Sequence, residues 1–497
     1  TWYSPDLIWI GFEPMEKPKH FGTDGIRGTA GSPPMTAEFV RALGAAAARV
    51  LGGGEQSAPL FVIGRDTRLS GPGLQAALTE GLLASGAQVI DLGVLPTPGI
   101  AFLTRKLGAD AGVVISASHN PAPENGIKFL NAQGMKLSEE VELAIEALLD
   151  SAPIGGALGV KNGELLREDY LQDLLESQPG LDLSGKTLLL DCANGAAFEV
   201  APDVFRRLGA RVIALNTEPN GENINHSAGS EHLRSDPAAF ENLVREHQAD
   251  LGMAFDGDAD RVILVDEGGR MVDGDHMLAI LAEYFLERGE LLGETLVTTT
   301  MANGGLADYC GHKGIHLVET PVGDKYITEE LSRLNSQDGT LGKIGLGGEQ
   351  SGHIILLDES HRTGDGIRTA LFVLRAMAES GWQPLSALRN QFEKFPQLIA
   401  SCNVAAKPDL AEISALNMLL AEIRQQLPGL ARLNLRYSGT EPKCRLMLET
   451  DTRHKPAELS RYAWQVCELI QRETGTPRGA KIEILNVSDG GLMPRPE

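Results

Sequence analysis

Short apolar runs alternate with segments of helical spacing along the middle of the chain. Residues 60–63 form an apolar run, residues 73–84 carry apolar side chains at helical intervals, and residues 87–92 are again strand-like. Strands that alternate with amphipathic helices are typical of βαβ units, in which the strands lie parallel in one sheet. The pattern therefore predicts an α/β protein.

This plan recurs further along the chain. Three segments share a glycine followed by an apolar, strand-like run: 86–92, 209–215 and, more loosely, 314–318. The tripeptide Ala-Asn-Gly follows such a run twice, at 193–195 and at 302–304. A polar, glycine-rich loop comes after each copy, at Ser118, Asp256 and Glu349. This self-similarity predicts three related α/β domains that present one functional loop each. Chance similarity between generic βαβ segments is the alternative.

The last part of the chain departs from the repeat. Strand-like runs and one long helical segment follow each other there: 433–436, 443–449, 459–472 and 481–485. We therefore expect an α/β fold of three related mixed α/β domains plus a smaller C-terminal α+β domain around a central cleft. A length of 497 residues fits this number of domains. The expected divisions are an N-terminal extension and four domains: 1–18, 19–160, 161–265, 266–385 and 386–497.

Ser118 is the most informative single residue. The apolar run at 112–115 leads into it and a His-Asn-Pro turn follows, so its hydroxyl is expected on a loop at the carboxyl end of a buried strand. Open α/β sheets bind ligands at that edge. Serine is a weak nucleophile and lacks the Gly-x-Ser-x-Gly surroundings of hydrolases here. Phosphorylated Ser118, with a charge of about −1.5 to −2, would suit a neighbouring metal ion. A plain turn residue is the alternative.

Three alternate carboxylates form the second loop. Asp256, Asp258 and Asp260 follow the strand-like run 251–255, and oxygen ligands in this arrangement suit Mg²⁺. A calcium-binding EF-hand is disfavoured, because Arg261 occupies the position where that loop requires glycine. Residues 262–265 are also strand-like rather than helical. A solvated acidic turn is the bland alternative, although three uncompensated carboxylates so close together would repel one another.

Other polar residues complete the candidate chemistry. Lys128 follows Ser118 by ten residues, which is long enough for a short loop that brings the chain back to the site. It could transfer a proton if Arg27 lowers its pKa. His119 could orient Ser118 or could simply satisfy the turn backbone. In residues 347–353, polar side chains alternate with glycines, as a hydroxyl- or ammonium-reading loop would need, or as a polar hairpin turn would show.

A basic loop near the C-terminus has the composition of a phosphate cradle. Arg436, Ser438, Gly439 and Thr440 lie together, with Arg445 close behind, and they supply guanidinium groups, hydroxyls and backbone N–H groups. The chain carries a net charge of −23. That charge disfavours nucleic acid and anionic membranes as partners. A phosphorylated small-molecule substrate would therefore need a local basic cluster of this kind.

Cysteine usage and hydropathy indicate in which cellular compartment the protein is expected. The five cysteines are scattered and form no CxxC pair, which fits reduced thiols and a cytoplasmic location. No run of about 18 apolar residues occurs, so no membrane span is expected. Residues 1–14 lack the features of a signal peptide. Met15 is a candidate natural start, which would make residues 1–14 an addition to the native chain.

Taken in order, these loops resemble the α-D-phosphohexomutase family. The similarity runs from residues 21–28 to the Arg436 loop and covers nearly the whole chain beyond the N-terminal extension. Further segments carry it: 348–353, 363–366 and 438–442. One departure is Ala259, which stands where glycine is usual. A methyl group is expected to be tolerated there if the residue has a negative φ.

The resemblance implies a four-domain, heart-shaped enzyme with specific roles for the residues in its central cleft. It implies catalytic residues Ser118 (as the phosphoserine), Lys128 (as general acid/base), His119 and Arg27. One Mg²⁺ would be held by Asp256, Asp258, Asp260 and a phosphoserine oxygen. Sugar contacts are implied for Arg261, Glu349 and Ser351. Phosphate contacts are implied for Arg436, Ser438, Gly439, Thr440 and Arg445.

The reaction implied is transfer of the Ser118 phosphate to the 1-hydroxyl of glucosamine 6-phosphate, with a 1,6-bisphosphate intermediate whose other phosphate returns to Ser118. Glucose or glucosamine 1,6-bisphosphate is the implied activator. Mannose and glucose phosphates are alternative substrates, because Glu349 could serve a C3 hydroxyl as well as a C2 ammonium. A homodimer is compatible with the sequence.

Two readings outside this family remain. Asp256-x-Asp258 after a strand also resembles an aspartyl-phosphate phosphatase of the haloacid dehalogenase type. A non-catalytic sugar-phosphate sensor that kept the fold is the third interpretation. The complete set of nucleophile, metal loop and phosphate cradle argues against a sensor.

Overall fold

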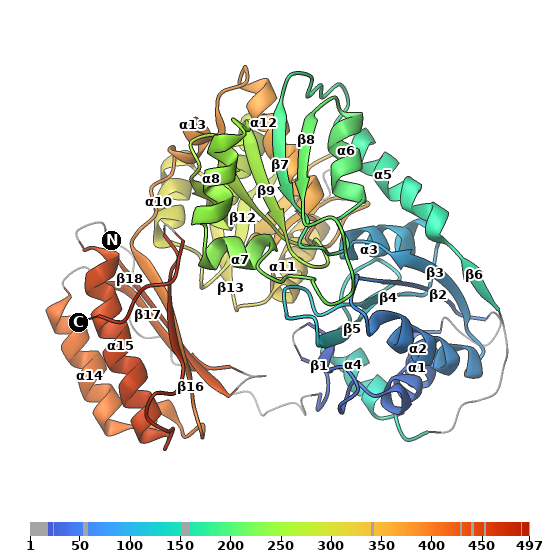
Figure 1. Ribbon diagram of the computed structural model, residues 1–497, viewed down its shortest axis with the longest axis horizontal. Helices are drawn as coiled ribbons and strands as arrows, with labels where there is room; N and C mark the ends of the chain where they lie inside the picture. The colour runs from blue at the N-terminus through green and yellow to red at the C-terminus, as the bar shows by residue number, and fades with distance from the viewer. Residues whose placement is uncertain are drawn as a thin grey trace.

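In the computed structural model, four sheets follow one another along the chain (Figure 1). The structure describes residues 18–22, 24–52, 58–151, 159–338, 342–427, 430–438, 442–451, 454–488 and 490–496. Almost all of the expected N-terminal extension, including Met15, lies outside the described residues. The first and C-terminal sheets stand at the two ends of an arc, and the other two sheets join them.

The first domain is built on a six-stranded sheet of order β1-β5-β4-β2-β3-β6. Its strands are β1 Ile26–Thr29, β2 Leu60–Arg65, β3 Gln88–Val94, β4 Ala111–Ile115, β5 Glu124–Asn131 and β6 Val160–Asn162. Its helices are α1 Ala37–Leu51, α2 Gly71–Ala84, α3 Thr97–Lys106 and α4 Glu139–Glu146. The boundary expected at 160 falls at the start of β6, which still pairs with β3.

The second domain has a five-stranded sheet of order β11-β10-β9-β7-β8. Its strands are β7 Thr187–Asp191, β8 Arg211–Leu215, β9 Leu251–Phe255, β10 Val262–Asp266 and β11 Met271–Val272. Its helices are α5 Arg167–Glu176, α6 Val200–Arg207, α7 Gly229–Ser235 and α8 Ala238–Glu246. Residues 262–265 are thus a strand, which excludes an EF-hand at the Asp256 loop.

The third domain has a four-stranded sheet of order β13-β12-β14-β15. Its strands are β12 Leu291–Thr299, β13 His316–Thr320, β14 Ile344–Gly348 and β15 Ile354–Leu357. Its helices are α9 Gly274–Glu287, α10 Gly304–Lys313, α11 Asp324–Asp338, α12 Gly366–Glu379 and α13 Leu385–Arg389.

The C-terminal domain differs, because all neighbours in its sheet β17-β18-β16-β19 run antiparallel. Its strands are β16 Gln397–Asn403, β17 Leu430–Tyr437, β18 Lys443–Thr450 and β19 Ile482–Asn486. Its helices are α14 Ser414–Gln426 and α15 Pro456–Glu473. The domain has its own apolar core, whereas the largest core cluster runs through all three α/β domains. The predicted smaller α+β domain is confirmed.

The first three sheets contain the same four-strand unit. The units are β3-β2-β4-β5, β8-β7-β9-β10 and β13-β12-β14-β15. In each unit the first three strands are parallel, and the fourth returns antiparallel to the third. The strand-like runs found to be similar in sequence are β3, β8 and β13, which occupy the same position in each unit. The predicted repeat is therefore confirmed and is not a chance similarity.

The repeat places the three candidate loops at equivalent positions. The Ser118 loop connects β4 to β5, the Asp256 loop connects β9 to β10, and the Glu349 loop connects β14 to β15. Strands β4 and β9 are fully buried along their length, as apolar strands covered on both sides must be. The polar residues that follow them therefore lie in loops at the carboxyl ends of the strands. Among the described helices, none has both the length and the apolar character to cross a membrane.

Candidate active site

The Ser118 side chain lies against the Asp256 loop. Ser118 is fully buried, and its Oγ donates a hydrogen bond of 2.6 Å to Oδ2 of Asp256. The Nδ1 atom of His119 lies 3.3 Å from the same hydroxyl. The backbone of Ser118 is left-handed, with φ of 52°. A residue with a side chain keeps this conformation only where its surroundings hold it.

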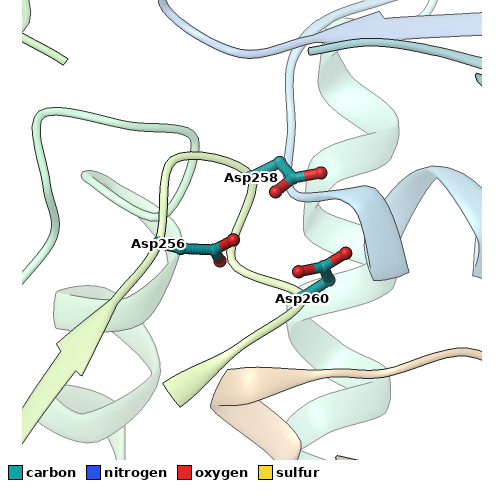
Figure 2. Close-up of side chains that lie close together, drawn as sticks. All are labelled: Asp256, Asp258 and Asp260. Atoms are coloured by element: carbon teal, nitrogen blue, oxygen red, sulfur yellow. The ribbon is translucent and has the colours of Figure 1, made fainter. Parts of the chain in front are cut away.

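Asp256, Asp258 and Asp260 form one buried cluster (Figure 2). One carboxylate oxygen from each lies within 4.8 Å of the others. Burial raises the pKa of Asp256 well above its ordinary value, and the charges of Asp260 and Asp258 raise it further. The Oδ1 atoms of Asp258 and Asp260 are buried and have no hydrogen-bond partner. A solvated acidic turn is therefore wrong, and the donor set fits a hard divalent cation such as Mg²⁺.

Lys128 reaches the same cluster from β5. Its Nζ lies 2.9 Å from Oδ2 of Asp258, 3.1 Å from Oδ2 of Asp24 and 3.7 Å from Oδ2 of Asp260. Burial by itself lowers the pKa of Lys128, but these three carboxylates outweigh it and raise the pKa. The expectation that Arg27 lowers this pKa is wrong in its net effect. Arg27 does act in that direction, but it pairs with Asp24 and is outweighed.

His119 and Arg261 meet beside Ser118. Nη1 of Arg261 is 3.4 Å from Nδ1 of His119, and its backbone N–H donates to Oδ1 of Asp256. Burial lowers the pKa of His119 to about 4, with help from the charge of Arg261, so the ring is neutral at pH 7. Glu231, at the start of α7, acts electrostatically on both residues and was not predicted.

The Glu349 loop is a hairpin turn that also reaches the site. The N–H of Glu349 donates to the carbonyl of His353 at 3.0 Å. The charge of Glu349 acts on both Arg261 and Arg436, so the loop lies between the metal loop and the phosphate loop. Ser351 Oγ is buried and has no hydrogen-bond partner. The polar-hairpin interpretation therefore describes the shape of this loop, and its role in reading a ligand stays a prediction.

Gln350, between these two residues, points into the boundary with the C-terminal domain. Its Nε2 donates to Oδ2 of Asp275 and to Oε1 of Gln397, each at 2.8 Å. The Nε2 of Gln397 in turn donates to Oε2 of Glu449 at 3.0 Å, a fully buried carboxylate on β18. A chain of hydrogen bonds thus connects the Glu349 loop to the domain that carries Arg436.

The predicted phosphate loop is described in part. Arg436 is the last residue but one of β17 and faces Arg445 across the β17–β18 pair, and both residues are only partly covered. Burial and the like charge of Arg445 lower the pKa of Arg436. Ser438 is buried, and its carbonyl accepts a 2.6 Å hydrogen bond from Nζ of Lys407, which was not predicted. Gly439 and Thr440 lie outside the described residues.

A second group of charged residues was missed as well. Lys136 lies 2.5 Å from Oδ1 of Asp24 and 2.8 Å from Asp324. His353 lies between the metal loop and Asp324, with Nδ1 3.6 Å from Oδ1 of Asp260 and Nε2 3.5 Å from Oδ2 of Asp324. Further residues without a predicted role are hydrogen-bonded to the metal and Ser118 loops or to one another beside them: Asp66, Arg68, Thr97 and Asn225.

Ala259 stands in the middle of the metal loop with φ of 57° and is fully buried. The negative φ that would make its methyl group harmless is therefore not present. An L-residue in the left-handed region costs roughly 1–2 kcal/mol. The backbone of this loop is fixed by hydrogen bonds from the N–H of Ala259 to the carbonyl of Asp256 and from the N–H of Gly366 to the carbonyl of Ala259.

Three repeated α/β units and a fourth domain, with a buried serine against an acidic cluster, define a phosphohexose mutase fold and site. The chain belongs to the phosphoglucomutase/phosphomannomutase family. Residues 18–153, 168–269 and 273–395 match alpha/beta/alpha domains I, II and III of that family, and residues 400–466 match its C-terminal domain.

Within the family, the chain is similar to curated phosphoglucosamine mutases. It is 45% identical over 464 residues to that of Symbiobacterium thermophilum, covering 92% of this chain and 99% of the relative. It is 44% identical over 472 residues to that of Geotalea daltonii, covering 93% and 99%.

Solved structures share the fold. A phosphoglucomutase/phosphomannomutase family protein from Burkholderia thailandensis superposes with a TM-score of 0.72 at 24% identity, over 94% of this chain and 100% of the other. The Aspergillus fumigatus N-acetylphosphoglucosamine mutase, in complex with glucose 1,6-bisphosphate, gives 0.63 at 17%, over 94% and 97%.

Proposed function

We propose that this protein interconverts glucosamine 6-phosphate and glucosamine 1-phosphate through a phosphoserine at Ser118. The observation that carries the proposal is the 2.6 Å contact between Ser118 Oγ and Asp256, next to two further carboxylates that fit a divalent cation. The similarity to curated phosphoglucosamine mutases over nearly the whole chain supports the choice of hexose.

Two phosphoryl transfers complete the reaction. In the first, the 1-hydroxyl oxygen of glucosamine 6-phosphate bonds to the phosphorus on Ser118, the P–Oγ bond breaks, and the proton lost by the sugar hydroxyl is balanced by one gained on Ser118 Oγ. The bisphosphate then turns over. In the second, Ser118 Oγ loses its proton and bonds to the phosphorus at position 6, the P–O6 bond breaks, and O6 gains a proton in exchange. Phosphate is conserved, and the product is glucosamine 1-phosphate.

The acidic cluster would hold Mg²⁺ through Asp256, Asp258 and Asp260 together with an oxygen of the phosphorylated Ser118. When bound, the cation would neutralise charge on the transferring phosphoryl group. The raised pKa of Asp256 and the buried Oδ1 atoms of Asp258 and Asp260, which have no hydrogen-bond partner, support this assignment, because a cation would favour the charged form of Asp256 and supply a partner to those oxygens.

Lys128 would hold the proton that is exchanged with the sugar hydroxyl. Three carboxylates around its Nζ keep the ammonium form in the enzyme before the sugar binds. A charged donor suits the step in which the sugar oxygen leaves. The ring of His119, neutral at pH 7, places Nδ1 3.3 Å from Ser118 Oγ, where it would help to orient the residue.

The sugar and its own phosphate would bind between two loops. Glu349 and Ser351, with Arg261, would contact the ring, and the loop from Arg436 to Thr440, with Arg445, would bind the phosphate. Glu349 can pair with the C2 ammonium of glucosamine. A carboxylate also accepts from a C3 hydroxyl, so phosphomannomutase/phosphoglucomutase activity is the alternative. Comparing kcat/KM for glucosamine, mannose and glucose 1-phosphates decides between them.

Ser118→Ala provides the test. With ³²P-labelled glucose 1,6-bisphosphate, the native protein should acquire acid-stable label on the peptide that contains Ser118, and the variant should acquire none and lose mutase activity. Hydroxylamine-labile label on Asp256 would instead indicate the phosphatase of the haloacid dehalogenase type. A native protein that takes no label and converts no sugar phosphate would be a sensor. Ser151→Ala serves as a matched control.

Three further properties belong to this proposal. A 1,6-bisphosphate would act as the activator that phosphorylates Ser118. A homodimer and a cytoplasmic location remain predictions from the sequence. All five cysteines are buried free thiols, which supports the expected reducing surroundings.

A further inference from the structure

Arg68 lies in the turn after β2 and is 1% exposed. All five of its guanidinium N–H groups donate hydrogen bonds. Nε donates to Oδ2 of Asp66 at 2.8 Å. The other four donate to backbone carbonyls of the β4–β5 loop: Ser118 at 3.0 Å, Asn120 at 2.8 Å, Pro121 at 2.5 Å and Glu124 at 2.8 Å.

The loop therefore folds around one buried cation. Four of its carbonyls converge on Arg68, where a strand or helix would have supplied N–H groups to them. Asn225, from the second domain, adds a hydrogen bond to the Ser118 carbonyl at 2.8 Å and one to Asn120 at 3.0 Å. The Ser118 carbonyl lies in the buried part of this segment, and without these donors it would be left unsatisfied, which would favour another shape of the loop.

The amide on the other side of Ser118 is held by the same pair of residues. The N–H of Ser118 donates to Oγ of Ser116 at 2.9 Å, and that hydroxyl donates to Oδ2 of Asp66 at 2.6 Å. Asp66 is also the carboxylate that receives Nε of Arg68. The Asp66–Arg68 pair thus fixes both peptide groups of Ser118. This explains how Ser118 keeps its left-handed backbone and directs Oγ toward Asp256.

We propose that Arg68 is a positioning residue for phosphoryl transfer: it acts through the backbone of Ser118 and does not bind the sugar. The inference rests on the proposed function, because it takes Ser118 as the phosphate carrier. A substitution of Arg68 should therefore lower kcat and leave KM nearly unchanged. The loops assigned to sugar and phosphate binding, at Glu349 and Arg436, are built on other domains, whereas the guanidinium of Arg68 donates to Asp66 and to residues 118–124.

The test is Arg68→Lys, with Arg65→Lys as the matched control. Lysine carries the same charge but offers three donors from one flexible point, so it cannot serve four carbonyls and Asp66 together. Arg65 lies on the same strand end, and its Nη1 is 3.4 Å from the Asp66 carbonyl. Arg68→Lys should lower kcat by about 100-fold, the effect of roughly 1 Å of misplacement. KM should stay within about threefold, and Arg65→Lys should resemble the native enzyme.

The rate at which ³²P from glucose 1,6-bisphosphate labels Ser118 distinguishes a failure of the role of Arg68 from a failure of the proposed function. Slow labelling in Arg68→Lys, with native circular dichroism, supports the inference. Labelling and kcat at native rates overturn it, as does a parallel loss of activity and folded protein. Absence of label in the native enzyme would overturn the proposed function itself. Guanidinium ion at millimolar concentration should restore part of kcat to Arg68→Ala, and ammonium ion should not; equal rescue by both would count against positioning.

Discussion

The hydroxyl of Ser118 and the carboxylate of Asp256 are joined by a 2.6 Å hydrogen bond across 138 residues of chain. The bond crosses from the first domain to the second, so the geometry of the candidate nucleophile depends on how the two units pack. The tight fit of the loops supports this dependence: a Cβ on Gly257 would come within 2.4 Å of the Ser118 carbonyl.

Mg²⁺ binding should release protons. The pKa of Asp256 is raised well above its ordinary value by burial and by Asp260 and Asp258, so the cluster keeps a proton to higher pH than an isolated carboxyl group. A bound cation displaces that proton, and affinity should therefore weaken as the pH falls. Titration calorimetry in two buffers of different ionisation enthalpy measures the release. Asp258→Asn should bind Mg²⁺ at least tenfold more weakly. An enthalpy independent of buffer would contradict the proton release.

Lys128→Gln should reduce both activity and stability. Its ammonium lies between Asp24 and Asp258, and its removal takes away the ion pair described for the buried Asp258, at a cost of roughly 3–5 kcal/mol. Loss of a positioned acid/base group typically lowers kcat by about 10²–10⁴-fold. Urea unfolding without metal and a coupled mutase assay measure the two effects. Lys161→Gln, on exposed β6, should change neither; kcat within tenfold of native in Lys128→Gln would refute the role.

Glu142→Gln should stabilise the protein at neutral pH. Burial raises the pKa of Glu142 from 4.5 to about 7, against the opposing charge of Lys325. Between pH 4.5 and about pH 7, the carboxyl group of Glu142 is ionised in the unfolded chain but stays protonated in the folded one. The stability of the native state therefore falls as the pH rises through this range. The variant cannot ionise and should lack this slope. Above pH 7 it should gain roughly 1–3 kcal/mol. Chemical unfolding from pH 4 to 8 tests this, with Glu140→Gln as the exposed control; identical slopes would disprove it.

Ala259→Gly should leave stability within about 1 kcal/mol of native. Glycine relieves about 1–2 kcal/mol of left-handed strain, but it loses roughly 0.8 kcal/mol of methyl burial and gains about 0.4–1 kcal/mol of unfolded-state entropy. Ala259→Val should destabilise by more than about 2 kcal/mol and weaken Mg²⁺ binding, because a β-branched residue is an outlier at positive φ. Thermal unfolding and Mg²⁺ titration compare the two, and a stable valine variant would contradict the strain.

The sequence located two functional loops by one signal, a buried strand that ends in polar residues. That signal located Ser118 after β4 and the acidic cluster after β9. A strand buried on both faces consists of apolar residues, so the polar residues that follow it lie in the loop at the edge of the sheet. The same signal is present at Asp66–Arg68 after β2, but no chemistry was predicted from it there.

What the sequence could not provide is the set of partners across domains. The pKa of Lys128 follows from Asp24 and Asp258, which come from other loops, rather than from the charge of Arg27 alone. Lys136 meets Asp324 only because the first and third domains pack together. The conformation of Ala259 likewise depends on backbone contacts that no pattern of residue types reveals.

The threefold use of one parallel–parallel–antiparallel unit has an evolutionary consequence. Three identical subunits in a ring would have to carry the same hairpin sequence, so each would present the same side chains to a shared centre. Covalent fusion removes that constraint, because each copy can then carry a different hairpin sequence: one with the serine, the next with the three aspartates, and the last with the Glu349 loop.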